Sequence, residues 1–335
     1  MTINRNKLLI LIVLPVILFF VSLFLGRYPV APGTVLKILA DSLVPGTFEC
    51  HDTARTVILQ VRLPRILLAM LVGAGLSISG ATFQGMFRNP LVSPYILGVC
   101  SGAGFGAALA ILCSESPLLI QVSAFSFGLA AVTMAYTLSR VSTSTPVLMM
   151  VLSGVVLSAL FSALISLAKY VADPYEKLPA IVFWLMGSLS GRSLKDFGFI
   201  VIPILMGTTG LLLVRWRINV MSLGHEEART LGVNIEVMKG IVITCATVIT
   251  AAAVCVSGVI GWVGLVIPHI GRMLVGPDHR VLLPATLAIG AAYLLMIDNL
   301  ARILTATEIP LGILTAIVGA PFFAYLLRRT KGGWE

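Results

Sequence analysis

The chain has 335 residues, of which 58% are hydrophobic and only 11% are charged. Soluble domains are normally about 25% charged, and a globule of this length cannot hide so large an apolar share in one core. The composition therefore argues against a cytosolic enzyme, a disordered chain or a disulfide-stapled secreted domain. The net charge of +9 fits a topology signal and contact with membrane lipid better than a nucleic-acid surface, so no nucleic acid is expected as a partner.

Charge-poor stretches separated by polar residues predict ten membrane-spanning helices, because about 20 apolar residues are needed to cross the hydrocarbon layer. The first stretch follows Arg5 and Lys7 and lacks a small-x-small cleavage site, so we interpret it as a retained helix rather than a signal peptide. The expected spans are 8–26, 64–83, 95–113, 118–138, 147–169, 197–214, 240–257, 259–275, 282–303 and 312–327. The sequence thus predicts an all-α polytopic membrane protein with a single transmembrane domain, residues 1–335.

The few charges favour one orientation of these helices. With the N-terminus inside, 13 of the 23 Lys and Arg residues face the cytoplasm. Five of the 14 acidic residues fall on the same side, which gives +8 inside and +1 outside. Because basic residues are concentrated on the cytoplasmic side of membrane proteins, we expect both termini in the cytoplasm. The expected location is the cell membrane (the inner or cytoplasmic membrane).

Three connections are longer than simple turns. Residues 27–62 are expected outside, with a short amphipathic helix after a Pro-Gly pair. Residues 170–196, also outside, contain an apolar piece, 181–189, that is too short to span and suits a re-entrant or surface helix. Residues 215–239 are expected inside and carry the densest group of charges in the chain.

No pattern for catalysis or nucleotide binding is present. A P-loop needs a Gly-Lys pair, and the sequence contains none. Asp298 and Arg302 share one helix face, where a local ion pair explains them as well as a function does. His269 is interpreted as a hydrogen-bonded bundle histidine rather than a proton relay. Residues 49–52 (ECHD) could look like a metal site but are taken as a coincidence on an outer loop. We expect a non-catalytic chain without a metal or cofactor of its own.

Two arginines open the second span at the expected outer surface. Arg62 and Arg65 flank Pro64, which suits the first turn of a helix. Cations there oppose the positive end of the helix dipole, at a cost of about 0.3–1 kcal/mol each, so the sequence favours a further role for them. Docking of an acidic partner protein from outside is one interpretation, and arginines that reach lipid headgroups are the other.

The densest group of charges is expected in the cytoplasm and runs from Ser222 to Gly232. Its start has the pattern of a capping box with Ser222 as the cap, and Gly232 is a typical stop. The predicted short helix presents a small apolar face made of Leu223, Ala228 and Leu231. Such a helix is a docking element for another subunit, and a solvated connector is the alternative.

Several long motifs, in the same order along nearly the whole chain, resemble the permease subunits of FecCD-type (type II) ABC importers, which take up iron chelates, haem and cobalamin. The motifs are VRLPR (61–65), GAGL (73–76), GATFQG (80–85), RNPL (88–91), PYILG (94–98), SGA (101–103), GWVGLVIPHIGR (261–272), GPDHR (276–280), EIPLG (308–312) and GAP (319–321). The resemblance implies the type II ABC importer permease fold with about ten helices per subunit. It also implies two permease copies, expected as a homodimer, two ATPase subunits and a substrate-binding protein on the outer side.

The resemblance implies roles for single residues as well. Arg62 and Arg65, with Arg302 beside them, match the arginines that meet acidic residues of the binding protein. The segment of about 216–239 matches the region that docks on the ATPase. The residues expected to couple to it are Leu223, Gly224, His225, Glu226, Ala228, Leu231 and Gly232.

The expected cytoplasmic gate comes from two separate loops. Asn89 and Leu91 match one half of this gate in the family. Ser142 and Thr143 lie in the loop where its other half sits. The fifth and tenth spans flank the path in such importers, so they are expected to do so here.

The resemblance thus implies a permease that moves an iron–siderophore or related metal chelate inward, while ATP and Mg²⁺ are bound by the partner ATPase. Cobalamin, haem and molybdate or tungstate are alternative cargoes, since residues 177–189 resemble several members, including a branch that moves molybdate or tungstate. An ion-coupled secondary transporter is less favoured, because it would need carboxylates or broken helices near the midplane. A membrane-embedded enzyme is also less favoured, because it should show a set of catalytic residues inside the spans and none is seen in the sequence.

Overall fold

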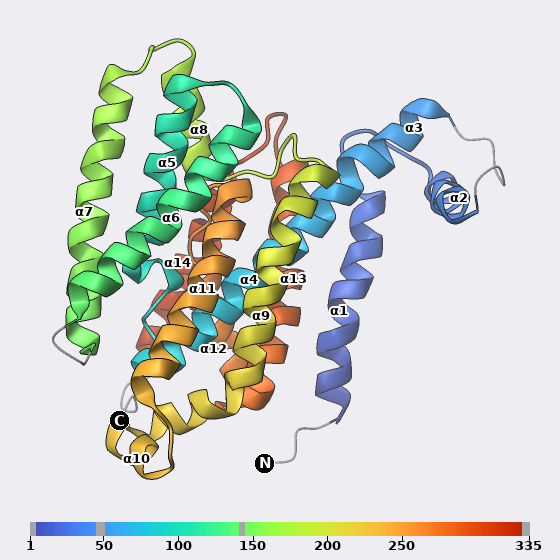
Figure 1. The fold of residues 1–335 in the computed structure, drawn as a ribbon. Coiled ribbons are helices and arrows are strands. Elements are labelled where there is room, and N and C mark those ends of the chain that lie inside the picture. Colours follow the sequence, from blue (N-terminus) through green and yellow to red (C-terminus); the bar gives the residue numbers. More distant parts are fainter. Residues whose placement is uncertain (1–4, 45–50, 141–144, 330–335) are drawn as a thin grey trace.

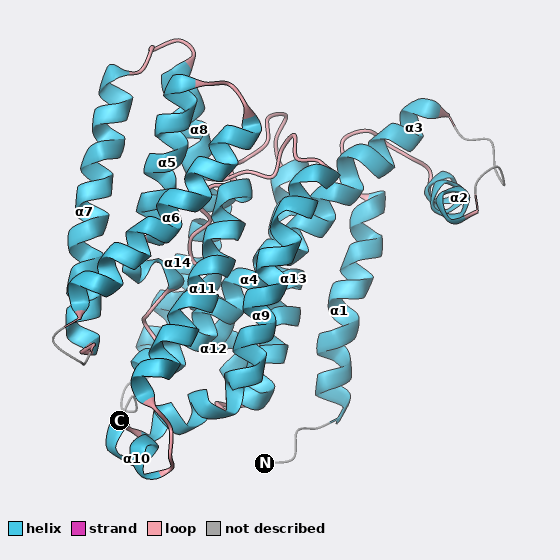
Figure 2. Ribbon diagram, viewed as in Figure 1, coloured by secondary structure: helices cyan, strands magenta, loops and turns pink. Residues whose placement is uncertain are grey.

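The computed structural model describes residues 5–44, 51–140 and 145–329, and this part of the chain is a bundle of helices without a strand (Figures 1 and 2). The long helices run side by side in one general direction, and short helices cap both ends of the bundle. An all-helical arrangement is what a polytopic chain requires, because every backbone hydrogen bond can then close within a helix. The predicted fold class is confirmed.

Each predicted span coincides with a helix of the structure, although many boundaries differ by several residues. The elements are α1 (Arg5–Phe24), α2 (Pro32–Leu43), α3 (Asp52–Thr56), η1 (Val57–Arg62), α4 (Leu63–Phe87), η2 (Pro94–Leu97), α5 (Val99–Cys113), α6 (Pro117–Ser139), α7 (Val147–Val171), α8 (Lys177–Met186), α9 (Leu194–Leu223), α10 (His225–Thr230), α11 (Ile235–Ser257), α12 (Val263–Val275), α13 (His279–Ile303) and α14 (Leu311–Arg329).

By length and apolar composition, six of the described helices can cross a membrane alone. One of them is the continuous unit Asp52–Phe87, which starts twelve residues before the predicted span at 64 because α3 and η1 run on into α4. The predicted spans 8–26, 95–113, 259–275 and 312–327 correspond to shorter apolar helices. The structure therefore supports a multi-pass membrane protein, and the predicted number of ten crossings stays a prediction.

The two ends of the bundle differ in what they carry (Figure 1). One end, which we call the α10 end, holds α10, the start of α1 and the last turns of α14. The other, the α8 end, holds α8 and the connections on either side of it, and α2 and α3 project beside it. The amphipathic helix predicted after the Pro-Gly pair is α2, and the predicted short apolar piece is α8, with Ile181 and Trp184 buried.

Close helix contacts in the core depend on glycine. A Cβ on Gly73 would collide with the carbonyl oxygen of Gly290, so α4 and α13 touch backbone to backbone. A Cβ on Gly80 would meet the backbone of Gly264 in α12 in the same way. Small residues permit this approach inside a membrane, where association depends on van der Waals packing rather than on the hydrophobic effect. The helix α4 is consequently the central helix of the bundle, enclosed along most of its length.

Candidate functional site

The three arginines predicted to dock a partner protein do come together at the α8 end. Arg62 ends η1, Arg65 lies in the first turn of α4 and Arg302 lies in the last turn of α13. All three are buried, with exposed fractions of only 3%, 5% and 6%. A shallow cavity of about 200 Å³ reaches them, and its lining includes Glu308. The sequence placed these cations on an open outer face, whereas the structure places them beneath the surface.

Arg65 is held between two carboxylates. Its Nε donates to Asp298 Oδ1 at 2.8 Å, and its Nη1 donates to Glu308 Oε1 and Oε2, both at 2.8 Å. Asp298 is fully buried, while the side chain of Glu308 is 24% exposed. Arg302 Nε lies 3.3 Å from Asp298 Oδ2, which is the helical ion pair weighed from the sequence. Two carboxylates thus compensate two buried cations.

Arg62 and Arg302 also bind neighbouring main chain and amide groups. Arg62 Nη1 donates to the carbonyl oxygen of Leu23 at 2.8 Å, and Nη2 donates to that of Tyr28. Arg302 Nη2 donates to Asn299 Oδ1. The bonds from Arg62 join the end of α1 to the end of η1. Arg302 Nε has the Asp298 ion pair but no hydrogen bond of its own among the described residues. The sequence missed this arrangement because Glu308 lies beyond the end of α13, and nothing local links it to Arg65.

The charged segment at the α10 end folds differently from its predicted pattern. Ser222 is not a helix cap, because it lies inside α9 and its hydroxyl donates to the carbonyl oxygen of Asn219 at 2.6 Å. The cap of α10 is Gly224, whose φ of +150° strongly favours glycine. Leu223 therefore ends α9 instead of opening the short helix. The predicted stop is close to correct, since α10 ends at Thr230, two residues before Gly232.

One side of α10 faces the bundle and the other is open. Ala228 is fully buried, and its carbonyl oxygen accepts from the backbone N–H of Val233 at 2.9 Å. Leu223 and Leu231 are 60% and 56% exposed, and Glu226 is exposed. The backbone of His225 forms the first residue of α10. Exposed leucines at the end of a bundle are the kind of contact that another protein covers.

The predicted gate residues lie at the same end of the bundle, as far as the structure describes them. Asn89 and Leu91 are exposed in the loop after α4, where Asn89 Oδ1 accepts from the N–H of Leu91 at 2.9 Å. Arg88 holds this loop with a φ of +52°, a left-handed cap that is usually glycine. Ser142 and Thr143 lie outside the described residues.

A clamp links the end of the second gate loop to α11. The N–H and hydroxyl of Thr145 both donate to Glu236 Oε2, the former at 3.2 Å. Lys239, only 3% exposed, donates to the carbonyl oxygen of Thr145 at 2.8 Å and pairs with Glu236 Oε1 at 2.9 Å. We call this group the Thr145 clamp. It fixes the chain next to the predicted gate to the first turns of the helix that follows α10.

A second link joins α9 to the turn between α12 and α13. Asn219 Nδ2 donates to Asp278 Oδ1 at 2.6 Å, and Asn219 Oδ1 accepts from the N–H of His279 at 2.8 Å. Bonds from Arg280 and Asn219 hold the pKa of Asp278 well below its usual range, although burial opposes them. The GPDHR motif contains Asp278, His279 and Arg280, but its partner on α9 could not be identified from the sequence.

No group of three His, Cys, Asp or Glu residues among the described residues could hold a metal ion. Within the segment 49–52, Glu49 and Cys50 lie outside the described residues. His269 is 7% exposed within α12.

Comparisons with known proteins identify the family. The model of the FecCD transport family matches residues 12–329. The molybdate import system permease protein MolB of Haemophilus influenzae is 45% identical over 323 residues, which cover 96% of this chain and 95% of the relative. The cobalamin import system permease protein BtuC of Halobacterium salinarum is 43% identical over 285 residues, which cover 85% of this chain and 76% of the relative.

A solved structure supports the fold. A metal-chelate type ABC transporter in an inward-facing conformation superposes with a TM-score of 0.87 at 43% sequence identity, covering 97% of this chain and all of the other. The family match and the shared architecture both extend over the spans, the arginine cluster and α10. This chain belongs to the FecCD transport family and is a membrane-spanning permease of the ABC importer class.

Proposed function

We propose that two copies of this chain form the membrane path of an importer for an iron–siderophore or a related metal chelate. The permease does not hydrolyse ATP; two separate ATPase subunits do so at the α10 end, which faces the cytoplasm together with both termini. A substrate-binding protein docks at the α8 end. The membrane is the cell's cytoplasmic (inner) membrane. Relatives at 43–45% identity that are named as permeases of molybdate and cobalamin import systems support the importer class.

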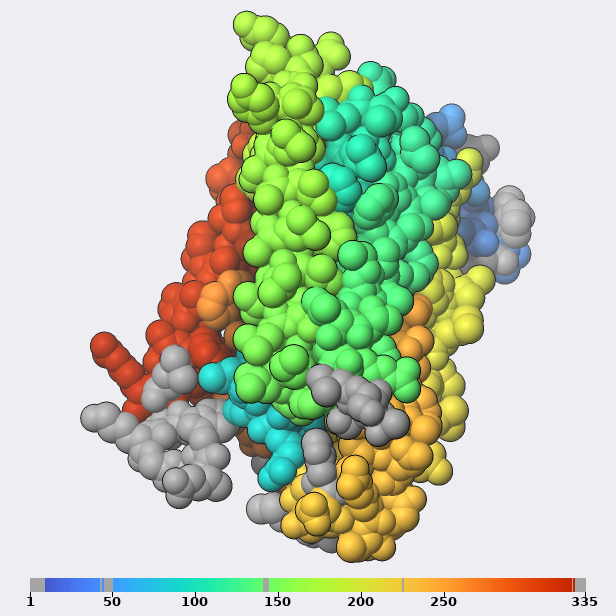
Figure 3. Space-filling model, turned by 60° about the vertical axis from the view of Figure 1, so that its left-hand side comes forward, coloured from blue at the N-terminus to red at the C-terminus, as the bar shows by residue number. Residues whose placement is uncertain are grey.

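The observation that carries the proposal is an uncharged apolar face on α7 and α14. Only 28% of the most apolar stretch of α7 is buried, against 72% for that of α11. Exposed side chains on this face include Leu152, Val156, Ile313 and Ile317. Figure 3 shows α7 at the front of the molecule with α14 beside it. A second permease copy covers part of this face, and the remainder lines the path.

Molybdate is the second candidate cargo. The similarity to the MolB permease extends over 96% of this chain. An apolar face does not distinguish an oxyanion from a metal chelate, because in this arrangement the binding protein selects the cargo and the path only has to release it. Cobalamin and haem belong to the same group of alternatives.

Transport follows from coupling between the two ends. The binding protein engages the α8 end, nucleotide acts at the α10 end, and each biases the same inward–outward equilibrium of the path, so their effects are reciprocal. At the α8 end, a carboxylate of the binding protein competes with Glu308, the more exposed partner of Arg65, for the cluster of Arg62, Arg65 and Arg302.

The gate and coupling residues complete this mechanism. Leu223 and Leu231 contact the ATPase, and Gly224, His225, Glu226, Ala228 and Gly232 shape the segment that holds them. Asn89 and Leu91 form one half of the cytoplasmic gate, opposite Ser142 and Thr143. The Thr145 clamp passes movement of the α10 region to the second half of the gate.

Reconstitution tests the proposal. The permease is placed in liposomes with its cognate ATPase and binding protein, and uptake of a ferric siderophore, molybdate, cobalamin and haem is measured separately. We expect uptake of one of them that requires ATP and the binding protein. Uptake that follows an ion gradient and ignores ATP would contradict the mechanism, and exclusive uptake of molybdate would select the second candidate.

A further inference from the structure

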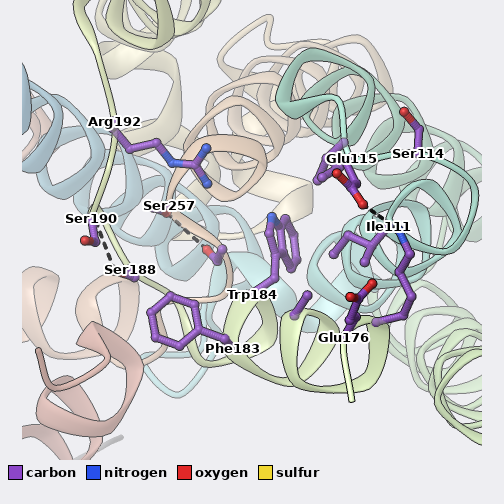
Figure 4. Close-up of a pocket in the computed structure, with 14 residues that line it drawn as sticks. Ile111, Ser114, Glu115, Glu176, Phe183, Trp184, Ser188, Ser190, Arg192 and Ser257 are labelled. Carbon is purple, nitrogen blue, oxygen red and sulfur yellow. Dashed lines mark hydrogen bonds and ion pairs between the residues drawn. The ribbon is translucent and has the colours of Figure 1, made fainter. Parts of the chain in front are cut away.

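A cavity at the α8 end lies away from the arginine cluster and is lined by another arginine, Arg192, which is partly exposed. It encloses about 490 Å³ between α8, the α5–α6 connection, the end of α11 and the segment before α9. This volume is within the usual range for small-molecule sites. Arg192, Trp184 and Ser188 line one part of it, and Glu115 and Glu176 line another (Figure 4). We call it the Arg192 pocket.

Two nitrogen donors in this pocket have no acceptor. Among the described residues, Arg192 Nε and Trp184 Nε1 are buried atoms without a hydrogen-bond partner. Figure 4 shows the guanidinium group of Arg192 and the indole nitrogen of Trp184 pointing towards the same space. Leaving buried donors unpaired costs about 1–3 kcal/mol for each group, and more for a charged one. Such a pair of donors fits an acceptor that comes from outside the chain.

Ser188 can add a third donor. Its Oγ accepts from the N–H of Ser190 at 3.0 Å, which leaves its own proton free to donate. Its backbone N–H donates to the carbonyl oxygen of Ser257 at 2.8 Å and so fixes its position against the end of α11. The Ser257 hydroxyl, in contrast, already donates to the carbonyl oxygens of Ala253 and Gly258 and is not available.

The charges around Arg192 leave it without a direct counter-ion. Burial lowers the pKa of Arg192, and Asp196 acts on it only through space in the opposite direction. The carboxylate of Asp196 is occupied by the N–H and hydroxyl of Ser193 and by Gln121. Glu115 pairs with Lys177 at 3.7 Å, across the pocket from Arg192. The negative groups therefore lie away from the donors, and an anion beside Arg192 would not replace an existing ion pair.

We propose that the Arg192 pocket binds a tetrahedral oxyanion group between Arg192, Trp184 and Ser188. A guanidinium fork and an indole N–H match several oxygens of such a group at once, and charge-assisted bonds of this kind are the strong ones. The oxyanion is either a free phosphate-like ion or the phosphate of a lipid headgroup. The site is distinct from the arginine cluster and does not depend on which cargo the importer carries.

Binding to the purified full-length protein tests the proposal. Delipidated protein in detergent is dialysed against radiolabelled inorganic phosphate, and the phospholipid retained by gently purified protein is counted by native mass spectrometry. The variants are Arg192→Gln, Trp184→Phe, which keeps the ring but loses the N–H, and the control Lys195→Gln. Lys195 is an exposed cation three residues from Arg192, so its loss removes the same charge outside the pocket.

If the group is a free ion, the wild type and Lys195→Gln bind one phosphate per chain. Arg192→Gln then binds at least about 10-fold more weakly, as expected when a charged hydrogen bond is lost, and Trp184→Phe shows a smaller loss. If the group is a lipid headgroup, phosphate does not bind, but one phospholipid per chain is retained by the wild type and the control and is lost from Arg192→Gln.

Two outcomes overturn the proposal: Arg192→Gln behaves like the wild type in both assays, or Lys195→Gln loses as much binding as Arg192→Gln. Should Arg192→Gln fail to purify, Arg192→Lys replaces it. That variant keeps the charge and removes the fork, so it must still bind more weakly than the control.

Discussion

Arg65 and Arg192 are both largely enclosed at the α8 end, yet their surroundings differ. Arg65 lies between Asp298 and Glu308 at 2.8 Å from each, whereas Arg192 has no ion pair or hydrogen bond from its side chain among the described residues. A buried cation with internal counter-ions holds helices together, and removing it strands the carboxylates. A partly buried cation without them, whose Nε is buried and has no acceptor among the described residues, is explained better by something that binds to it. The two sites should therefore respond to substitution in opposite ways.

The largest loss of stability is expected for Arg65→Gln. It leaves the fully buried carboxylate of Asp298 with Arg302 alone, and breaking a buried pair costs about 3–5 kcal/mol. Thermal unfolding of the purified protein in detergent should show a markedly lower midpoint. The double variant Arg65→Gln/Asp298→Asn should lose less than the two single losses added together. A single variant as stable as the wild type would show that the pair does not hold α4 to α13.

An intermediate loss is expected for Arg62→Gln. This change removes the donors to the carbonyl oxygens of Leu23 and Tyr28 but strands no charge, so the cost is about 1–3 kcal/mol. The same thermal unfolding assay measures it. The effect should be localised, with faster hydrogen exchange at the end of α1. If Arg62→Gln destabilised the protein more than Arg65→Gln, the carboxylates would not be the main source of stability in this cluster.

A small effect on stability is expected for Arg192→Gln. Because no internal partner is lost, the free energy of unfolding should stay within about 0.5 kcal/mol of the wild type when phosphate and lipid are absent. Added phosphate should raise the midpoint of thermal unfolding of the wild type and leave that of Arg192→Gln unchanged. A large loss without any ligand would mean that Arg192 has a structural role like that of Arg65.

The smallest effect on stability is expected for Leu231→Glu, because the side chain is already 56% exposed. Its consequence should be functional instead. A charge on the open side of α10 should reduce ATP-dependent uptake and weaken retention of the ATPase during co-purification. Thr230→Glu, also exposed and adjacent to Leu231, controls for the added charge. Full coupled uptake by Leu231→Glu would remove this residue from the proposed ATPase contact.

Much of the fold could be predicted from the sequence because membrane spans are a property of local composition. The charge-poor stretches correspond to helices, and the short apolar piece at 181–189 becomes α8. Boundaries were less predictable where one helix runs on from another, as at α3, η1 and α4. The capping pattern at Ser222 was misleading because α9 continues through it and Gly224 makes the turn.

The candidate sites were less predictable, because their chemistry depends on residues distant in the chain. The motif around Arg62 and Arg65 indicated the correct place but the wrong exposure, since Glu308 and Asp298 approach from over 230 residues away. Arg192 stood out in no pattern, because only the fold places it beside Trp184. In the sequence, Arg192 is only an arginine that follows a short apolar segment, and its lack of a partner among the described residues becomes visible in the structure.

The helix α11 connects the two ends of the bundle, and this affects the exchange of its amide hydrogens with solvent. Its first turns hold the Thr145 clamp at the α10 end, and its last residue, Ser257, is bonded to Ser188 in the Arg192 pocket. Most of the residues between are buried, and from Ile249 to Ser257 every residue is. Amide deuteration along α11 should therefore be slow and uniform, and it should change at both ends together. This single helix can thus report, in one peptide-level experiment, on events at opposite faces of the membrane.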